Sequence, residues 1–369
     1  MGMTSEWKEY ELGNICSRLS SGKGIKAAMI SDTAEYAVYG GNGIRGYTSD
    51  YNFEGDCAII GRQGAYCGNV RYFSGKAYMT EHAVIACANS EHNTRYLSYV
   101  LTAMDLGRLS GQSAQPGISV KTLSIQKVKM PSLNLQRKIV AVISSLEEKI
   151  ELNAAINENL EQQAQALFKD MISDVQEQVP FTSVIQVLGG GTPKTGNQEY
   201  WNGEIPFFTP KDVGNPYVLT TEKSITPLGL DNCNSRLYPV NTVFLTARGT
   251  VGKVSLAGVP MAMNQSCYAL AGKDGLHQII VYHYVLETVK ALKHKASGAV
   301  FDAIITRDFD TENVPALSPE QIKNYIAFAE PIYNEILNRS VENQRLATLR
   351  DTLLPKLMNG EIDVSAVKI

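Results

Sequence analysis

The stretch IVAVISSLEEKIELNAAINENLEQQAQALFKDM, residues 139–171, decides the fold of this chain. Apolar and amide residues recur in it at alternating steps of four and three: Ile139, Ile143, Leu146, Ile150, Asn153, Asn157, Leu160, Ala164, Leu167 and Met171. That spacing is the a/d seam of a helix that packs lengthwise along another helix. The stretch therefore predicts a long helix that needs a long helical partner.

A second seam of the same spacing, somewhat more polar, supplies that partner. Adding 186 to each position gives Tyr325, Ala329, Ile332, Ile336, Arg339, Asn343, Leu346, Arg350, Leu353 and Leu357. Four positions are identical in the two copies: Ile150 and Ile336, Asn157 and Asn343, Leu160 and Leu346, and Leu167 and Leu353. We predict that these eight residues lie on the faces through which the two helices pair. The matched asparagines are either exposed through a slightly wrong heptad frame or buried to fix register, and their recurrence favours burial.

The ends of both helices are marked in the sequence. Ser318-Pro319-Glu320-Gln321 offers a capping serine, a proline at the first helical position and a glutamine at the third. Asn134 is a candidate cap for the first helix. We expect Pro331 to kink the second helix, Pro355 to distort or end it, and Gly360 to stop it.

The segments that precede the helices also repeat, more faintly. Phe53–Gly64 aligns with Tyr238–Gly249, and Met79–His82 aligns with Met263–Ser266. Both segments contain short β-type runs broken by Gly, Asn and Pro. The chain is therefore predicted to be an α+β protein: a head (1–134), a helix (135–175), a second head (176–317) and a second helix (318–369). Two such helices can pair as an antiparallel coiled coil.

Composition points to a protein of the cytoplasm. The six cysteines form no C-x-x-C pair, which argues against a disulfide framework and a zinc site. No apolar run is long enough to span a bilayer, and the first residues lack the pattern of a secretion signal. The net charge is −3, but residues 136–178 carry 4 Lys/Arg against 8 Asp/Glu, whereas residues 1–135 carry 13 against 11. Any affinity for DNA would rest on local basic patches helped by a partner.

Catalytic motifs are absent or incomplete. Gly41–Gly46 spells G-x-G-x-x-G, yet no helix is expected after it. Gly191–Gly196 has the outer glycines of a phosphate loop but asparagine follows in place of lysine, and Asn215-Pro216-Tyr217 lacks the second proline of a methyltransferase loop. Glu147-Glu148-Lys149 resembles part of a nuclease motif but lies in the heptad segment, and His82 is the one histidine in a repeated element. We predict no catalytic residue, metal site or cofactor in this chain.

Polar loop residues instead suit contact with DNA. Arg, Asn and Gln can hydrogen-bond base edges, whereas Lys and Thr suit phosphates. The candidates in the first head are Asn42, Arg45, Arg62, Gln63, Tyr66, Asn69 and Arg71. Those in the second head are Thr192, Lys194, Lys211, Arg248, Thr250, Lys253, Asn264 and Gln265.

Three segments resemble a known family. Leu349–Ile362 resembles the C-terminal helix of type I restriction enzyme specificity subunits, and Gly189–Gly196 with Tyr200–Asp212 resembles the opening of their target-recognition domains. The similarity covers nearly the whole chain. The first head departs from the pattern, because Ser20-Ser21-Gly22-Lys23-Gly24 stands where that opening is expected.

The resemblance implies a non-catalytic subunit that recognises a split site in double-stranded DNA. Each head would recognise one half of the site, and the helix pair would set the gap between the halves. Two methyltransferase subunits would dock on this frame and restriction subunits would join them, so that S-adenosylmethionine, ATP and Mg²⁺ would belong to the partners. Two alternatives are an enzyme acting alone and a coiled-coil scaffold whose heads bind proteins; binding to DNA with and without a methyltransferase partner separates the three.

Overall fold

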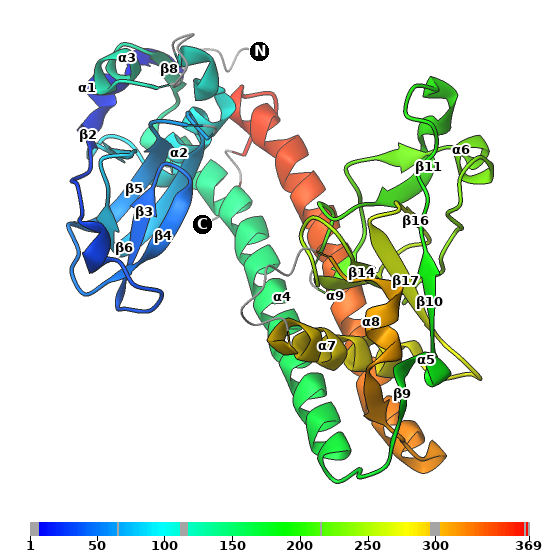
Figure 1. Ribbon diagram of the computed structural model, residues 1–369. Helices are drawn as coiled ribbons and strands as arrows, with labels where there is room; N and C mark the ends of the chain where they lie inside the picture. The colour runs from blue at the N-terminus through cyan, green and yellow to red at the C-terminus, as the bar shows by residue number, and fades with distance from the viewer. Residues whose placement is uncertain are drawn as a thin grey trace. The chain divides into compact units, whose positions relative to one another are not determined.

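The computed structural model describes residues 7–64, 66–110, 117–214, 216–295, 303–364 and 367. The chain divides into two compact units (Figure 1). Each unit has its own apolar core. Unit 1 consists of Met1–Lys149 and Leu346–Ile369, and unit 2 consists of Ile150–Arg345. Residues 1–149 and 346–369 are therefore far apart in sequence but fold together.

Unit 1 is built on a six-stranded sheet in the order β2-β7-β5-β6-β3-β4, with a separate β1-β8 pair. All neighbours are antiparallel except β3 and β6, which run parallel. Helix α2 packs against β5, β6 and β7. The strands are β1 (Lys8–Glu11), β2 (Cys16–Ser21), β3 (Tyr36–Gly40), β4 (Gly43–Thr48), β5 (Phe53–Gly61), β6 (Val70–Met79), β7 (Ala83–Ala88) and β8 (Lys127–Met130). The short helices are α1 (Leu12–Ile15), η1 (Ala27–Met29), α2 (Thr94–Ala103), η2 (Leu106–Leu109) and α3 (Val120–Ser124).

Unit 2 has a five-stranded sheet, β10-β17-β14-β15-β12, a three-stranded sheet, β13-β11-β16, and a β9-β18 pair. Helix α7 packs against β14, β15 and β17. The strands are β9 (Gln178–Pro180), β10 (Ile185–Gly189), β11 (Trp201–Phe208), β12 (Tyr217–Val218), β13 (Ser224–Ile225), β14 (Val243–Thr246), β15 (Val254–Ala257), β16 (Ala262–Met263), β17 (Cys267–Gly272) and β18 (Asn313–Pro315). The helices that lie wholly within unit 2 are α5 (Phe181–Val184), η3 (Gln198–Tyr200), α6 (Pro227–Asp231), α7 (Gln278–Lys295) and α8 (Thr306–Asp310).

The two units repeat one topology, as the sequence predicts. The parallel pairing of β3 with β6 in unit 1 recurs in unit 2 as β11 with β16. The units differ in two ways: β6 is one continuous strand whereas its counterpart is divided into β15 and β16 by residues 258–261, and unit 2 has an additional strand, β12, that runs parallel to β15. Pro260 lacks the N–H that a ladder requires, so the sheet of unit 2 breaks where that of unit 1 continues.

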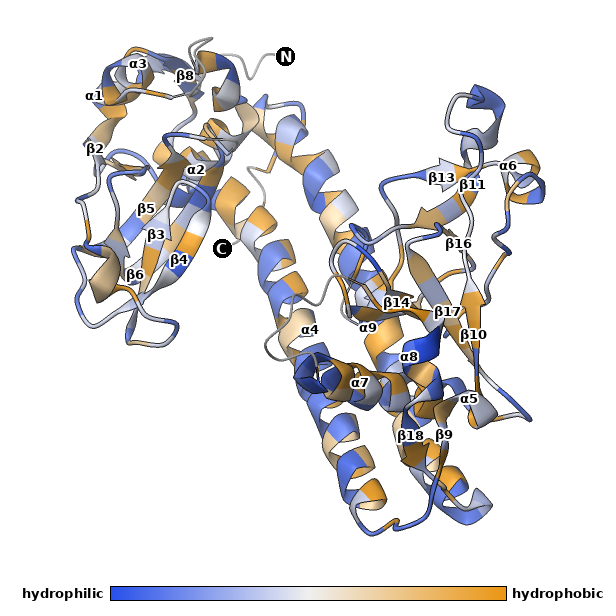
Figure 2. Cartoon of the chain, in the orientation of Figure 1, coloured by the Kyte–Doolittle hydropathy of each residue, from blue (hydrophilic) through white to orange (hydrophobic). Residues whose placement is uncertain are grey.

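Two long helices, α4 (Leu133–Ser173) and α9 (Pro319–Met358), contribute residues to both units. Within unit 2 they are antiparallel neighbours, because the Asn157 amide donates to the Ile336 carbonyl (3.3 Å) and the Tyr325 hydroxyl donates to the Ala164 carbonyl (3.0 Å). Figure 2 shows apolar and polar residues alternating along both helices. This mixture of apolar and polar residues agrees with the heptad pattern predicted from the sequence.

The helix caps agree with the sequence at α9 but not at α4. Ser318 Oγ accepts a hydrogen bond from the Gln321 N–H (3.2 Å), and Gln321 Oε1 accepts from the Ser318 N–H (2.9 Å). At α4 the cap is Ser132, whose Oγ accepts from the Leu135 N–H (3.4 Å), so the expected cap at Asn134 is wrong. Helix α9 runs past Pro355 to Met358, and Gly360 with φ of +76° follows it.

Leu167 is a second correction. The seam places it between the helices, yet 38% of its surface is exposed, and Phe168 is buried in its stead. A straight α-helix has 3.6 residues per turn, so a face that starts on a 3.5-residue repeat drifts by about 20° per heptad. After several heptads, the inward position has moved one residue along the chain, from Leu167 to Phe168.

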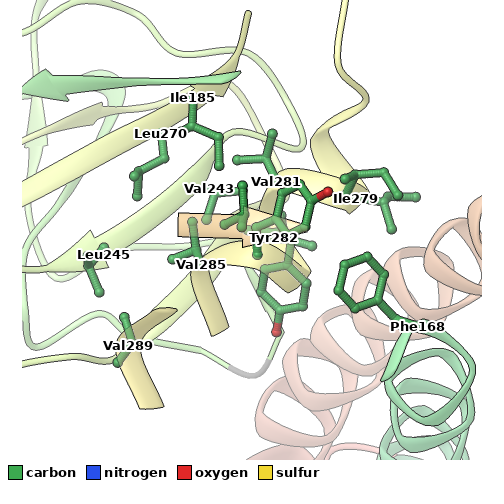
Figure 3. Close-up of a cluster of buried hydrophobic side chains, with 14 of the residues drawn as sticks. Phe168, Ile185, Val243, Leu245, Leu270, Ile279, Val281, Tyr282, Val285 and Val289 are labelled. Carbon is green, nitrogen blue, oxygen red and sulfur yellow. The ribbon is translucent and has the colours of Figure 1, made fainter. Parts of the chain in front are cut away.

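The core of unit 2 joins the sheet, α7 and the long helices. Figure 3 shows Phe168 of α4 pointing toward the side chains of α7, among them Ile279 and Tyr282. His283 is buried within this core, and its Nε2 lies 2.7 Å from the Tyr325 hydroxyl. The core of unit 1 contains residues from both helices in the same way: Ile139, Ile143 and Leu357 are all buried in one apolar cluster.

Candidate nucleic-acid interface

The β5–β6 loop of unit 1, residues 61–69, is closed by backbone hydrogen bonds at its base. The Gly61 N–H donates to the Asn69 carbonyl, and the Gly68 N–H donates back to the Gly61 carbonyl, both at 2.8 Å. Gly64 and Gly68 have φ of +81° and +88°, a conformation that side chains with a Cβ rarely adopt. Apart from Ala65, which lies outside the described residues, the loop is therefore closed at its base by backbone hydrogen bonds, and its side chains at Gln63, Tyr66 and Asn69 are exposed.

The β14–β15 loop of unit 2, residues 246–253, is closed in the same way. The Thr246 N–H donates to the Lys253 carbonyl (2.9 Å), and the Gly252 N–H donates to the Thr246 carbonyl (2.8 Å). Gly249 and Gly252 have φ of +80° and +71°. The left-handed Gly64 therefore corresponds to Gly249, and Gln63 is the counterpart of Arg248.

Neighbouring loops are tied to each hairpin by matching hydrogen bonds. In unit 1 the Arg62 N–H donates to the His82 carbonyl (3.0 Å) and the Lys23 N–H donates to the Met79 carbonyl (2.9 Å). These bonds bring the loops after β2, β5 and β6 together at one edge of the sheet.

Unit 2 uses the equivalent atoms. The Ala247 N–H donates to the Ser266 carbonyl (2.8 Å), and the Gly191 N–H donates to the Met263 carbonyl (3.2 Å). The backbone of the edge is thus the same in both units, although most of its side chains differ.

The predicted residues of unit 1 gather at this edge. Gln63 Oε1 lies 3.1 Å from His82 Nδ1, and Arg62 Nη1 donates to the Ser21 hydroxyl (3.4 Å). Arg71 Nη2 donates to the Asn42 carbonyl (3.3 Å), which ties β6 to the turn between β3 and β4. The remaining candidates, Arg45, Tyr66 and Asn69, are exposed.

The predicted residues of unit 2 are less uniform. Thr192 and Gln265 are hydrogen-bonded to each other, and Asn264 Oδ1 accepts from the Ser266 N–H (3.0 Å). Lys211 lies 3.5 Å from Glu222 Oε2, which partly neutralises it. The candidates Lys194, Arg248, Thr250 and Lys253 are exposed.

Sequence reasoning missed two residues that flank the hairpin loops. The sequence marks His82 only as a histidine in a repeated element, whereas in the structure its contact with Gln63 joins two loops that are not adjacent in sequence. Lys293 of α7 donates from Nζ to the Gly252 carbonyl (2.8 Å). Burial is the main reason that the pKa of Lys293 is lowered, and the nearby charge of Lys253 lowers it further. Lys253 and Lys293 are thus two cations close to this loop.

Among the described residues, the segments that resemble enzyme motifs in sequence do not have the structures that those motifs require. Gly41–Gly46 leads from the β3–β4 turn into a strand, not a helix, so no helix N-terminus is available for a pyrophosphate. Pro216 and Tyr217 of the methyltransferase-like tripeptide are described, whereas Asn215 lies outside the described residues. No group of three or more His, Cys, Asp or Glu side chains among the described residues could hold a metal ion.

Comparison with known proteins identifies the family. Residues 4–162 and 174–339 match the family described as "Type I restriction modification DNA specificity domain", and the two matches together cover most of the chain. The chain belongs to this DNA specificity family. Each matched stretch contains one β-rich head and at least half of the long helix that follows it.

Three members of the DNA specificity family illustrate the similarity. The chain is 38% identical over 146 residues to the type I restriction enzyme EcoprrI specificity subunit of Escherichia coli, which covers 38% of this chain and 36% of that protein. It is 31% identical over 166 residues to the MjaIX specificity subunit of Methanocaldococcus jannaschii, covering 44% and 38%. It is 24% identical over 327 residues to the HindI specificity subunit of Haemophilus influenzae, covering 67% and 71%. The chain thus spans little more than a third of the first two relatives.

The fold agrees with the DNA specificity family. The crystal structure of the type I restriction-modification S subunit from M. genitalium superposes with a TM-score of 0.64, covering 97% of both chains at 15% identity. In the part of the chain that the structure describes, no helix is long and apolar enough to cross a membrane.

Proposed function

We propose that this chain is the DNA-specificity subunit of a type I restriction-modification complex, and that each unit recognises one half of a bipartite DNA site. The observation that carries the proposal is the pair of hairpin loops, residues 61–69 and 246–253, which share their closing hydrogen bonds and left-handed glycines. Two recognition surfaces built on one backbone with different side chains suit a site whose halves differ in sequence. Membership of the DNA specificity family supports the same function.

The exposed side chains divide by the part of DNA that they suit. Lys253, Thr250 and Lys194 suit phosphate oxygens, whose contacts position a protein on the duplex without reading sequence. Gln63, Arg248 and Asn69 have the donors and acceptors that distinguish base edges in the major groove. On this proposal, the closed loops position the second group and the basic residues around them supply affinity.

The helices complete the proposal. Because α4 and α9 both contribute to both units, we propose that they set the gap between the two half-sites and provide the surface on which two methyltransferase subunits dock. Restriction subunits join in the full, cytoplasmic complex. The chain itself supplies recognition and no catalytic group, and S-adenosylmethionine, ATP and Mg²⁺ belong to its partners.

An exchange of the second head tests this function. The full chain is assembled with its methyltransferase subunits, and residues 179–317 are replaced by the second head of a relative. Sequencing of the methylated positions in a random duplex library then reports the site. We expect one half-site to change and the other to stay as in the unaltered chain.

Three results would contradict the proposal. A change in both half-sites, or in neither, means that the heads do not recognise DNA separately. If the unaltered complex methylates DNA without requiring a bipartite site, the proposed function is wrong. A chain that transfers methyl groups without partners is an enzyme instead of a specificity subunit.

A further inference from the structure

Gln63 and Arg248 occupy the same backbone position in the two hairpin loops but carry different side chains. We infer that this position selects one base in each half-site, with Gln63 recognising adenine and Arg248 recognising guanine. This inference rests on the proposed function and names the residues that carry it out.

The backbone at this position is anchored on both sides in each unit. The Ile118 N–H donates to the Arg62 carbonyl, and in unit 2 the Ile304 N–H donates to the Ala247 carbonyl, both at 2.9 Å. The next residue, Gln63 or Arg248, forms an isolated β-bridge, with Gly117 or Ala303 respectively. A left-handed glycine follows in both loops. A contact to a base edge requires a side chain held in a repeatable place, and this anchoring provides it.

In unit 1 a neighbour orients the amide of Gln63. His82 Nδ1 lies 3.1 Å from Gln63 Oε1, and Glu81 Oε1 lies 3.4 Å from Nε2 on the other side of the ring. Both ring nitrogens face an acceptor oxygen, so with a hydrogen on each His82 donates from Nε2 to the Glu81 carboxylate and from Nδ1 to the Gln63 amide oxygen, which keeps a second lone pair. Among the described residues, the amide nitrogen of Gln63 has no hydrogen-bond partner. It is free to donate to adenine N7 while the oxygen accepts from adenine N6, which is the bidentate pattern for this base.

In unit 2 the guanidinium of Arg248 is uncommitted. The described part of the chain places no carboxylate within 4 Å of it, and it makes no side-chain hydrogen bond there. Two other cations of this unit have partners, since Lys211 faces Glu222 and Lys293 donates to the Gly252 carbonyl. A free guanidinium at an anchored tip matches the O6 and N7 acceptors of guanine, the commonest bidentate contact to DNA.

The test exchanges the two side chains in the assembled complex. Arg248→Gln and Gln63→Arg are made in the full chain, and base preference is read from methylation of a random duplex library. We expect Arg248→Gln to move one position of the second half-site from guanine toward adenine by roughly 5- to 150-fold, and Gln63→Arg to do the reverse in the first half-site. Arg307→Gln, which removes the same charge from an exposed site on α8, should leave both half-sites unchanged.

The role of His82 is tested by a conservative pair. His82→Ala removes the donor and should weaken discrimination at the base that Gln63 recognises, whereas His82→Asn keeps a donor near the place of Nδ1 and should restore it. A loss that His82→Asn does not rescue means that His82 only supports the loop, and this overturns its positioning role.

The outcomes separate this inference from the proposed function. If Arg248→Gln and Gln63→Arg leave every base preference unchanged, or lower methylation equally at all sites, the two residues contact the backbone or nothing and the inference is wrong. The proposed function survives that result, because the unaltered complex still recognises a bipartite site. If the unaltered complex shows no bipartite site, the proposed function has failed first.

Discussion

The helix pair is built from different side chains in the two units. In unit 1 the buried residues of α4 and α9 include Ile139, Ile143 and Leu357. In unit 2 the same helices bury Asn153 and Asn157, which are hydrogen-bonded to residues of α9. One stretch of the pair is therefore held mainly by aliphatic contacts and the other by a mixture of apolar contacts and specific hydrogen bonds.

The two stretches of the helix pair should therefore contribute differently to its stability and to its register. Burial of aliphatic surface is favourable in many alternative alignments, because it has no direction. The amide of Asn153 has partners in one alignment: Arg339 Nη1 donates to its oxygen (3.0 Å), and its nitrogen donates to Asn343 Oδ1 (2.8 Å). A helix shifted by one turn would leave these groups buried without partners. The aliphatic stretch should thus dominate stability, and the amide stretch should fix the alignment.

The largest effect is expected from the aliphatic stretch. Leu357→Ala in unit 1 should lower the free energy of unfolding by about 2–5 kcal/mol, because it leaves a cavity in a buried cluster. Leu349→Ala is the control, since that leucine lies on the same part of α9 and is 45% exposed. Urea denaturation of both variants measures the difference. Equal, small losses would show that the apolar cluster does not stabilise the pair.

A smaller effect, with a different signature, is expected from the amide stretch. Asn153→Ala should cost about 1–3 kcal/mol, because Arg339 and Asn343 lose buried partners. Combined with Asn343→Ala, the losses should be non-additive by roughly 0.5–3 kcal/mol in a double-mutant cycle. Asn159→Ala, at an exposed position of α4, should be nearly neutral. Additive losses for Asn153 and Asn343 would mean that the two amides do not act together.

The third prediction concerns pH and unit 2. Burial lowers the pKa of His283 to about 3, whereas the unfolded value is near 6.5. Below pH 6.5 the unfolded chain binds a proton that the folded chain does not, so the folded state loses stability as pH falls toward 3. At pH 5 the loss from this residue reaches up to about 2 kcal/mol.

Glu161 works against this loss. Burial raises its pKa, so its burial penalty is relieved as pH falls. Because the Tyr325 hydroxyl donates to the Ala164 carbonyl, His283 Nε2 donates to the Tyr325 oxygen. His283→Gln keeps such a donor and removes the titration, so its stability should fall less between pH 7 and pH 5. Denaturation at both pH values measures the slopes. A steeper slope in the variant would assign the acid sensitivity to other residues.

The smallest effect is expected at Leu167. Because this leucine is 38% exposed and Phe168 is the buried neighbour, Leu167→Gln should change stability by no more than about 0.5 kcal/mol. Phe168→Ala is the contrasting variant. A large loss for Leu167→Gln would restore the heptad frame that the sequence suggested.

The sequence predicts periodic and repeated features better than contacts between loops. The two long helices follow from a ten-position seam, and the aligned segments Phe53–Gly64 and Tyr238–Gly249 place both hairpin loops. The seam fails at Leu167, where a heptad count and a 3.6-residue turn no longer agree. The contact of Gln63 with His82 and that of Lys293 with Gly252 join residues on separate elements. No spacing in the sequence predicts them, since they depend on how the strands are paired.

The division of the chain also bears on its synthesis. Unit 2 is one continuous segment, Ile150–Arg345, whereas the core of unit 1 includes Leu357 and Val364 together with residues of the first 149. A chain emerging from the ribosome therefore exposes an incomplete first core until its last helix is released, although N-terminal domains ordinarily fold first. Unit 2 can finish folding while unit 1 still waits. Ribosome stalling near residue 345 would leave the first head exposed to proteases and chaperones. Loss of the last two turns of α9 would likewise destabilise the N-terminal head, because Leu357 belongs to its core.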